Sequence, residues 1–291
     1  MHFACAGCQW SEGDEAPRDR YKSVPGVLDM ITRFRDKQNS RELYDYWDWL
    51  VIQYGHRSLT FDKDRLPAIA GLARIIGEAL QDRYLAGLWK GDLHHGLTWR
   101  SRSNLLSRGL DAHIRKIKKR NYVAPSWSWA ACPDVMNMRD DGTLVGEDSI
   151  IEGVHTDTHS DDLYGQVSGG YLRMRAKLTR MPIRFPNDNR TRWSSSWIHP
   201  VENISNHIQV NTDWLHKDEE VGLENLVVML LYRIENEDAK KAPILRALLL
   251  HLADESRNYY RVGFIESEGY EGYRKMRKWF EDSEEETICI I

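Results

Sequence analysis

Cysteine is scarce in this sequence, and the few cysteines present do not suggest a disulfide framework. The four are Cys5, Cys8, Cys132 and Cys289. Their spacing differs from that of small secreted domains, so a reducing compartment is the simpler setting. The first ten residues also lack the basic region and the apolar stretch of a secretory signal peptide. The sequence therefore predicts a cytoplasmic protein.

Long hydrophobic runs and an excess of positive charge are missing as well. The longest apolar run, Leu226–Tyr232, covers only about a third of the length that a membrane-spanning helix needs. The formal net charge is -4, so no overall positive field favours nucleic acid. We expect no membrane span and no nucleic-acid partner.

Sequence motifs for phosphate binding or serine hydrolysis are also absent. No segment shows a glycine-rich phosphate loop, a P-loop or a nucleophile elbow, and no internal repeat is visible. The pair Gly169–Gly170 lacks the strand-then-helix context that such motifs require. We therefore expect no cofactor.

Tryptophan, in contrast, is abundant. Eleven tryptophans occur among 291 residues, of which 41% are hydrophobic and 29% charged. That balance is typical of a soluble globular protein with a sizeable core. The indoles indicate either bulky aromatic packing or a surface rich in aromatic anchors.

Hydrophobic periodicity predicts helices in the first part of the chain. Leu43, Trp47 and Val51 recur at helical spacing, and Gly55 is a typical helix end. A second helix is expected to begin near Asp64, with the Asp64 carboxylate capping its first amides.

Two further helices are predicted over residues 88–99 and 103–119. We accordingly assign residues 1–40 to a poorly ordered N-terminal segment and residues 41–124 to a helical region. The final turn of the last helix carries a basic run, Arg115–Arg120. Cations are favourable at a helix C-terminus, and the alternative is a patch for an anionic partner.

After Pro125 the period becomes that of strands. Alternating apolar and polar residues predict strands over 171–178 and 208–214, each with one buried face. The pair Gly169–Gly170 is expected to form a hairpin turn before the first of them.

The remaining chain is also predicted to be mainly β. Expected elements are strands over 225–234, 244–252, 259–265 and 287–291, and a helix over 270–280. For 244–252 a short helix is the alternative. Residues 125–291 would thus form a mainly antiparallel β region with a late helix. The predicted fold class is α+β, a helical N-terminal layer packed on an antiparallel, sandwich-like sheet region.

The segment around Pro125 is expected to join the two regions. Pro125 favours an extended Ala124, and in an extended segment Trp127 and Trp129 project to one side. We expect the two indoles to form a wedge buried between the helical layer and the sheet. The alternative is an exposed aromatic clamp.

Three segments carry a family resemblance. They are LYDYWDWLVIQYGHRSLTFDKDRLPAIAGLA at residues 43–73, YLAGLWKGDLHHGLTWR at 84–100 and APSWSWA at 124–130. In this order they resemble the region that follows the HET domain in fungal heterokaryon-incompatibility proteins. Two tail features agree, Asp162–Gly165 and Tyr260–Gly263. The resemblance covers residues 40–291.

The resemblance implies an accessory, non-catalytic region that acts in interaction or regulation of self/non-self recognition, with an unidentified protein partner. The Gly-Trp-x-x-Gln-Glu-like run of the HET domain itself is not found. We therefore expect a truncated, Trp-rich product of a HET-family gene, or a relative that lacks the HET domain.

Two groups of residues could bind a metal. His155 and His159 are four residues apart and lie near Asp161, but the glutamate of an HExxH motif is missing. Cys5 and Cys8, with His2 nearby, form half of a zinc site without a second pair. We expect no metal site and no catalytic residue. The alternatives are a metal-assisted hydrolase using His155, His159 and Asp161, or a degraded gene fragment without independent function.

The adjacent pair His94–His95 is the last group of candidate site residues. Neighbouring side chains on a helix point in different directions. We expect one of these rings to be exposed and the other packed.

Overall fold

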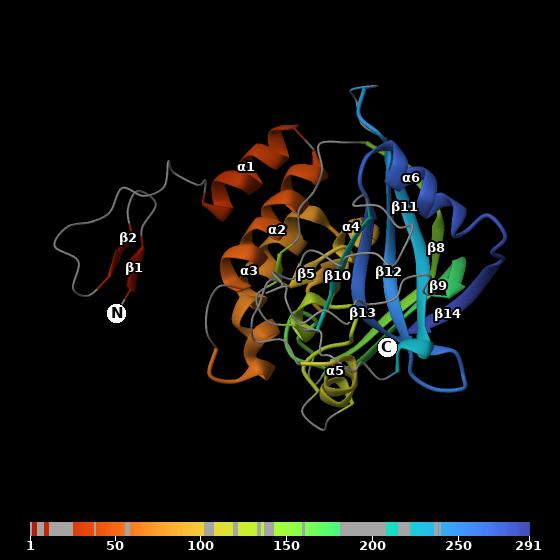
Figure 1. Ribbon diagram of the computed structural model, residues 1–291. Coiled ribbons are helices and arrows are strands. Elements are labelled where there is room, and N and C mark those ends of the chain that lie inside the picture. The colour runs from red at the N-terminus through yellow and green to blue at the C-terminus, as the bar shows by residue number, and fades with distance from the viewer. Residues whose placement is uncertain are drawn as a thin grey trace.

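The computed structural model has an α+β fold, as the sequence predicts (Figure 1). Helices occupy the N-terminal part, and a mostly antiparallel sheet occupies the C-terminal part. The structure describes residues 2–4, 9–11, 26–37, 39–55, 59–101, 108–118, 122–132, 135–136, 143–158, 161–180, 208–214, 222–235, 238 and 240–291.

Three helices form the N-terminal layer: α1 (Val27–Lys37), α2 (Ser40–Gly55) and α3 (Arg65–Leu80). Helix α2 buries Leu43, Trp47 and Val51 and ends at Gly55, as predicted. Asp64 occupies the N-cap position of α3, but the prediction that its side chain caps the helix is wrong, because that side chain makes no capping hydrogen bond.

The segment 1–40 contains regular structure that the sequence did not suggest. Strands β1 (His2–Ala4) and β2 (Gln9–Ser11) pair antiparallel. Helix α1 packs on α2 and α3, with Ile31 buried and Met30 against the core. The apolar residues of this otherwise charged segment therefore form one face of a helix, and that face is buried.

The predicted helical stretch over 88–99 is confirmed only in part. Residues 88–89 belong to a tight hairpin of β3 (Tyr84–Leu85) and β4 (Leu88–Trp89), and a 3₁₀ turn (Lys90–Asp92) and the short α4 (Leu93–Gly96) follow. Ala86 and Gly87 form the turn with positive φ angles of 46° and 99°, which suits a hairpin and cannot continue a helix. Helix α5 (Leu110–Ile117) matches part of the predicted helix over 103–119; residues 102–107, 119 and 120 lie outside the described residues.

Eight strands form the main sheet. They are β7 (Thr143–Glu147), β8 (Ser149–Thr158), β9 (Val167–Arg180), β10 (Ile208–Thr212), β11 (Leu226–Glu235), β12 (Ile244–Leu252), β13 (Asn258–Ser267) and β14 (Glu285–Ile290). All pairings are antiparallel except that of β13 with β14. Because β9 pairs with both β14 and β11, the path β11–β12–β13–β14–β9 closes on itself. Two small ladders, β3–β4 and β5–β6, lie outside it, where β5 is Arg100–Ser101 and β6 is Val135–Met136.

The predicted C-terminal strands are confirmed, and so is the late helix, α6 (Gly269–Lys278). Residues 244–252 form a strand, so the helical alternative is wrong. The predicted turn at Gly169–Gly170 is also wrong, since both glycines lie inside β9. A Cβ atom on Gly170 would lie 2.9 Å from Pro125 Cγ and 2.9 Å from the His155 carbonyl oxygen. Close packing, rather than a turn, therefore requires glycine there.

Two hydrophobic clusters lie on opposite faces of the central strands. Met229 and Leu231 belong to the first cluster, whereas Val228 and Leu230 belong to the second. The first cluster also contains the buried residues of α2 and α3, so helical layer and sheet share one core. The second is covered by α5 and α6. Figure 1 shows α1–α3 together on the side of the sheet opposite α6.

Candidate functional site

Tryptophans join the helical layer to the sheet at a site that we call the indole junction: Trp47, Gly87, Trp99, Trp127 and Trp129. The Gly87 carbonyl accepts hydrogen bonds from two indoles, Trp47 Nε1 at 2.9 Å and Trp129 Nε1 at 2.8 Å. Trp99 Nε1 donates to the Trp127 carbonyl at 3.0 Å. All four tryptophans are buried. The predicted burial of Trp127 and Trp129 is therefore confirmed, and the exposed clamp is wrong.

The backbone at this junction differs from the extended segment that was predicted. Trp129–Ala131 forms a 3₁₀ turn, and Ser128 Oγ caps it by accepting from Ala130 N at 3.0 Å. The same hydroxyl donates to the Ala86 carbonyl. One serine thus fixes both the turn and the β3–β4 hairpin, which local propensity alone does not indicate.

The three segments that carry the family resemblance meet here. Residues 43–73 supply Trp47 and Arg65, and Arg65 Nη1 donates to the Ala130 carbonyl at 2.9 Å. Residues 84–100 supply the Gly87 carbonyl and Trp99, and residues 124–130 supply the remaining indoles. The polar side-chain groups of these segments donate hydrogen bonds mainly to backbone carbonyls of the other segments. These hydrogen bonds cross-link the three segments.

A buried ion pair ties the junction to the sheet. Arg261, on β13, lies over the Trp99 ring with its guanidinium carbon 3.4 Å from the ring centroid. It donates to Asp213 Oδ2 at 2.6 Å and also to the Leu97 and Trp99 carbonyls. Both charged side chains are almost wholly buried. Removal from water raises the pKa of Asp213 to about 6, although Arg261 opposes that shift.

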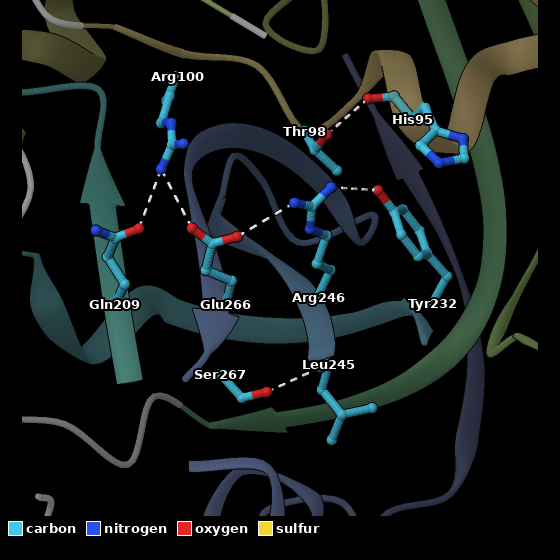
Figure 2. Close-up of polar contacts among 9 residues, drawn as sticks. All are labelled: His95, Thr98, Arg100, Gln209, Tyr232, Leu245, Arg246, Glu266 and Ser267. Atoms are coloured by element: carbon cyan, nitrogen blue, oxygen red, sulfur yellow. Dashed lines mark hydrogen bonds and ion pairs between the residues drawn. The ribbon is translucent and has the colours of Figure 1, made fainter. Parts of the chain in front are cut away.

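A second chain of polar contacts runs through the sheet (Figure 2). Arg100 Nη1 contacts Gln209 Oε1 at 3.0 Å and Glu266 Oε1 at 3.2 Å. Glu266 Oε2 accepts from Arg246 Nη2 at 3.3 Å, and Arg246 Nη1 donates to Tyr232 Oη at 2.9 Å. These contacts connect a half-buried arginine to the deep interior of the sheet.

The far end of this chain reaches a surface cleft. The His95 ring lies 5.3 Å from the Tyr232 ring, and His95 Nδ1 is 3.5 Å from Asp92 Oδ1. His94 Nε2 is 3.2 Å from the Ser149 carbonyl oxygen. The prediction that one of His94 and His95 is exposed is wrong, because both are half-buried against the sheet.

Sequence reasoning missed Arg246, Arg261 and Asp213. A signal existed, because Arg246 and Arg261 interrupt apolar runs that were correctly assigned to buried strands. A charged residue at such a position requires a buried partner. The identity of that partner depends on tertiary structure and could not be predicted from the sequence.

Two clefts lie beside β8. The first, the Lys90 cleft, has a volume of about 530 Å³ and is lined by Arg41, Tyr44, Lys90, Gly91, Asp92, Leu93, His94, His95, Ile150 and Ile151. The second, the Arg83 cleft, has a volume of about 450 Å³ and is lined by Asp82, Arg83, Tyr84, His155, Thr156, Asp157, Thr158, Leu163 and Tyr164. Both clefts therefore have one wall from β8 and one from residues 82–95.

The predicted metal candidates do not come together in the described structure. His155 lies on β8, where its Nε2 is 2.9 Å from Asp157 Oδ1. Asp161 is exposed. His159, Cys5 and Cys8 lie outside the described residues. Within the described ranges, no three His, Cys, Asp or Glu side chains are grouped so that they could bind a metal.

The described cysteines are poorly suited to nucleophilic catalysis. Cys132 is buried, and burial raises the pKa of its thiol, so the reactive thiolate is disfavoured. Burial also raises the pKa of Cys289. Neither cysteine lines the Lys90 cleft or the Arg83 cleft.

Among the described residues, no helix combines the length and the apolar character that crossing a bilayer requires. No protein-family model matches the chain, and no curated protein or solved structure matches it.

Proposed function

We propose that this chain is an accessory, non-catalytic region of a HET-type incompatibility protein that acts in the cytoplasm through protein interaction. One observation carries the proposal. The three segments that resemble the family meet in the indole junction, where they cross-link the helical layer and the sheet. Such an arrangement supports a scaffold that positions other surfaces.

A scaffold of this kind can also regulate. The helical layer and the sheet share one core, and the Lys90 cleft has one wall from Arg41 and Tyr44 of α2 and another from Ile150 and Ile151 of β8. A partner bound there contacts both layers at once. If it binds one arrangement of the layers more tightly than another, it shifts the population towards that arrangement.

The experiment is inducible expression in a filamentous fungus, with viability scored by dye exclusion. Three proteins are compared: residues 1–291 alone, a HET domain from a related protein alone, and that HET domain fused in front of residues 1–291. We expect no death from residues 1–291 alone, and we expect the fusion to change the response to the HET domain. Death caused by the isolated chain would contradict the proposal. A fusion that behaves like the HET domain alone would favour the degraded-fragment alternative.

The hydrolase alternative is tested by metal analysis. His155 is paired with Asp157 on an exposed strand face, so we expect the purified protein to contain no stoichiometric zinc. Elemental analysis that finds one zinc per chain, lost in a His155→Ala variant, would reverse the ranking of the two functions.

A further inference from the structure

The Arg83 cleft, at the end of β8, carries more negative than positive charge. Its lining contains two carboxylates, those of Asp82 and Asp157, and one permanent cation, Arg83. Because the remaining titratable group near Asp157 is the imidazole of His155, the lining keeps an excess negative charge whenever that ring is neutral. The electrostatic potential of the cleft therefore favours a cationic occupant.

Three donors hold the Asp82 carboxylate in place without neutralising it. Tyr44 Oη and Gly91 N each donate to Asp82 Oδ2 at 2.9 Å. Arg83 N donates to Asp82 Oδ1 at 2.7 Å. All three are uncharged groups, so these hydrogen bonds fix the position of the carboxylate and leave its negative charge in the cleft.

Asp157 supplies the second carboxylate from β8. It pairs with Gly169 of β9, and a Cβ atom on Gly169 would lie 2.6 Å from Asp157 Oδ2. The absence of a side chain at Gly169 therefore leaves the space that this carboxylate occupies. The Asp157 side chain is 57% exposed, so a ligand in the cleft can reach it.

Tyr84 gives an independent indication of an occupant. It lines the same cleft and is 5% exposed, and its hydroxyl has no hydrogen-bond partner among the described residues. A buried hydroxyl without a partner costs stability. A guanidinium has five N–H donors, enough to supply this oxygen as well as two carboxylates.

A guanidinium suits these groups better than an ammonium. Its planar fork donates to several acceptors at once, and its flat face stacks on aromatic rings. Beside the cleft the protein already holds one guanidinium in this way: Arg74 donates to Asp162 at 2.9 Å, and its guanidinium carbon lies 5.7 Å from the centroid of the Tyr164 ring. Leu163 lines the cleft and is 66% exposed, so the methylene groups of an arginine gain an apolar contact there.

We propose that the Arg83 cleft binds an arginine side chain of a partner protein, whose guanidinium donates to Asp82 and Asp157. The volume of about 450 Å³ is near the lower end for small-ligand sites, which suits a single side chain. The inference rests on the proposed function, because it names the group by which a protein partner is recognised.

The test is a ligand-observed NMR titration of the full chain with capped five-residue peptides that carry arginine, lysine or citrulline between alanines. Citrulline has nearly the shape of arginine and no charge. The titration is made at pH 8, at which histidine side chains are ordinarily neutral. We expect the arginine peptide to bind most tightly, and the citrulline peptide to bind about tenfold or more weakly than it. Free L-arginine, a fourth ligand, should bind more weakly than the arginine peptide, because its α-carboxylate is repelled.

Substitutions in the cleft locate the binding. Asp157→Asn removes one negative charge, and Tyr84→Phe removes only the hydroxyl; each should weaken the arginine peptide by about threefold. Arg83→Gln removes the competing cation and should strengthen binding. Asp282→Asn, the same charge change at an exposed site after α6, should leave affinity unchanged. Thermal melts check that each variant is folded.

Equal binding of the arginine and citrulline peptides would overturn the proposal, and so would equal binding of the lysine peptide. Tighter binding of free L-arginine would overturn it by identifying a small molecule as the occupant. Affinity that ignores Asp157→Asn and Tyr84→Phe, or that falls in Arg83→Gln, would place the peptide elsewhere. Failure of the viability experiment with intact arginine binding would contradict the HET-type function and leave the cleft assignment standing.

Discussion

At the scale of single residues, the indole junction distinguishes two tryptophans that the sequence presents as equivalent. Trp129 Nε1 donates to the Gly87 carbonyl, whereas Trp127 Nε1 is buried without a hydrogen-bond partner among the described residues. A buried donor without a partner costs stability. The two indoles therefore contribute similarly to packing. The indole N–H group stabilises the fold at Trp129 and destabilises it at Trp127.

This difference predicts the order of two substitutions. Trp129→Phe loses a buried hydrogen bond, and Trp127→Phe removes a donor that has no bond to lose. We expect Trp129→Phe to be more destabilising by roughly 1–3 kcal/mol. Urea denaturation of the two variants measures the difference. Equal losses of stability in the two variants, or a greater loss at Trp127, would contradict this assignment of hydrogen bonds.

Asp213 predicts a dependence of stability on pH. The pKa of this carboxyl is about 6 in the folded protein, above the value of about 4 in an unfolded chain. Between these values the folded protein holds a proton that the unfolded chain releases. The stabilising contribution of this site is therefore fully present below about pH 4 and is lost as the pH rises through 6.

The matched variant is Asp213→Asn, which keeps the side-chain shape and cannot titrate. We expect the unfolding free energy of the native protein, minus that of the variant, to fall by up to about 3 kcal/mol between pH 4 and pH 7. Chemical denaturation at several pH values measures it. A difference that stays constant with pH would show that Asp213 is charged throughout this range.

At the scale of elements, β8 and β9 depend on an unusually close contact. Gly170 packs against Pro125 and the His155 carbonyl, both 2.9 Å from the position of an added Cβ. Gly170→Ala should therefore destabilise the protein by about 1–3 kcal/mol. Gly71→Ala in α3 is the control, because nothing lies within 4 Å of its added Cβ. That control should be neutral or stabilising by up to about 1 kcal/mol. Thermal melts that rank the two in reverse order would contradict the close packing of β9 on Pro125.

The same elements show what the sequence could reveal. Strand β9 was predictable from its alternation of apolar and polar residues and β11 from its near-continuous apolar run, because both signals are local. The hairpin turn at Ala86–Gly87 was not predicted, because its positive φ angles are held by tertiary hydrogen bonds that the sequence does not reveal. Strand β8 gave little signal, because its exposed positions and its bulge obscure the alternation. The clefts were unpredictable, since their walls come from segments more than fifty residues apart.

At the scale of the whole molecule, the boundary near residue 125 is a change of secondary structure within one core. The first hydrophobic cluster includes Trp47 and Ile76 from the helices together with Leu172 and Leu248 from the sheet. Separating the layers would expose all of this surface.

We therefore expect unfolding in a single cooperative step. Tryptophan fluorescence reports on the packing around the eleven indoles, four of which lie in the indole junction. Far-ultraviolet circular dichroism reports on helices and strands throughout. The two denaturation curves should coincide. Two separated transitions would show that the helical layer and the sheet are independent units.

The shared carbonyl of Gly87 constrains which substitutions the protein can accumulate during evolution. Because it accepts from both Trp47 and Trp129, loss of either indole leaves the oxygen with one donor, and loss of both leaves it buried with none. The second loss is therefore costlier than the first, which is negative epistasis between positions 47 and 129. During evolution, one of these tryptophans can be replaced and later restored. Replacement of both should persist only in proteins in which the β3–β4 turn has also changed.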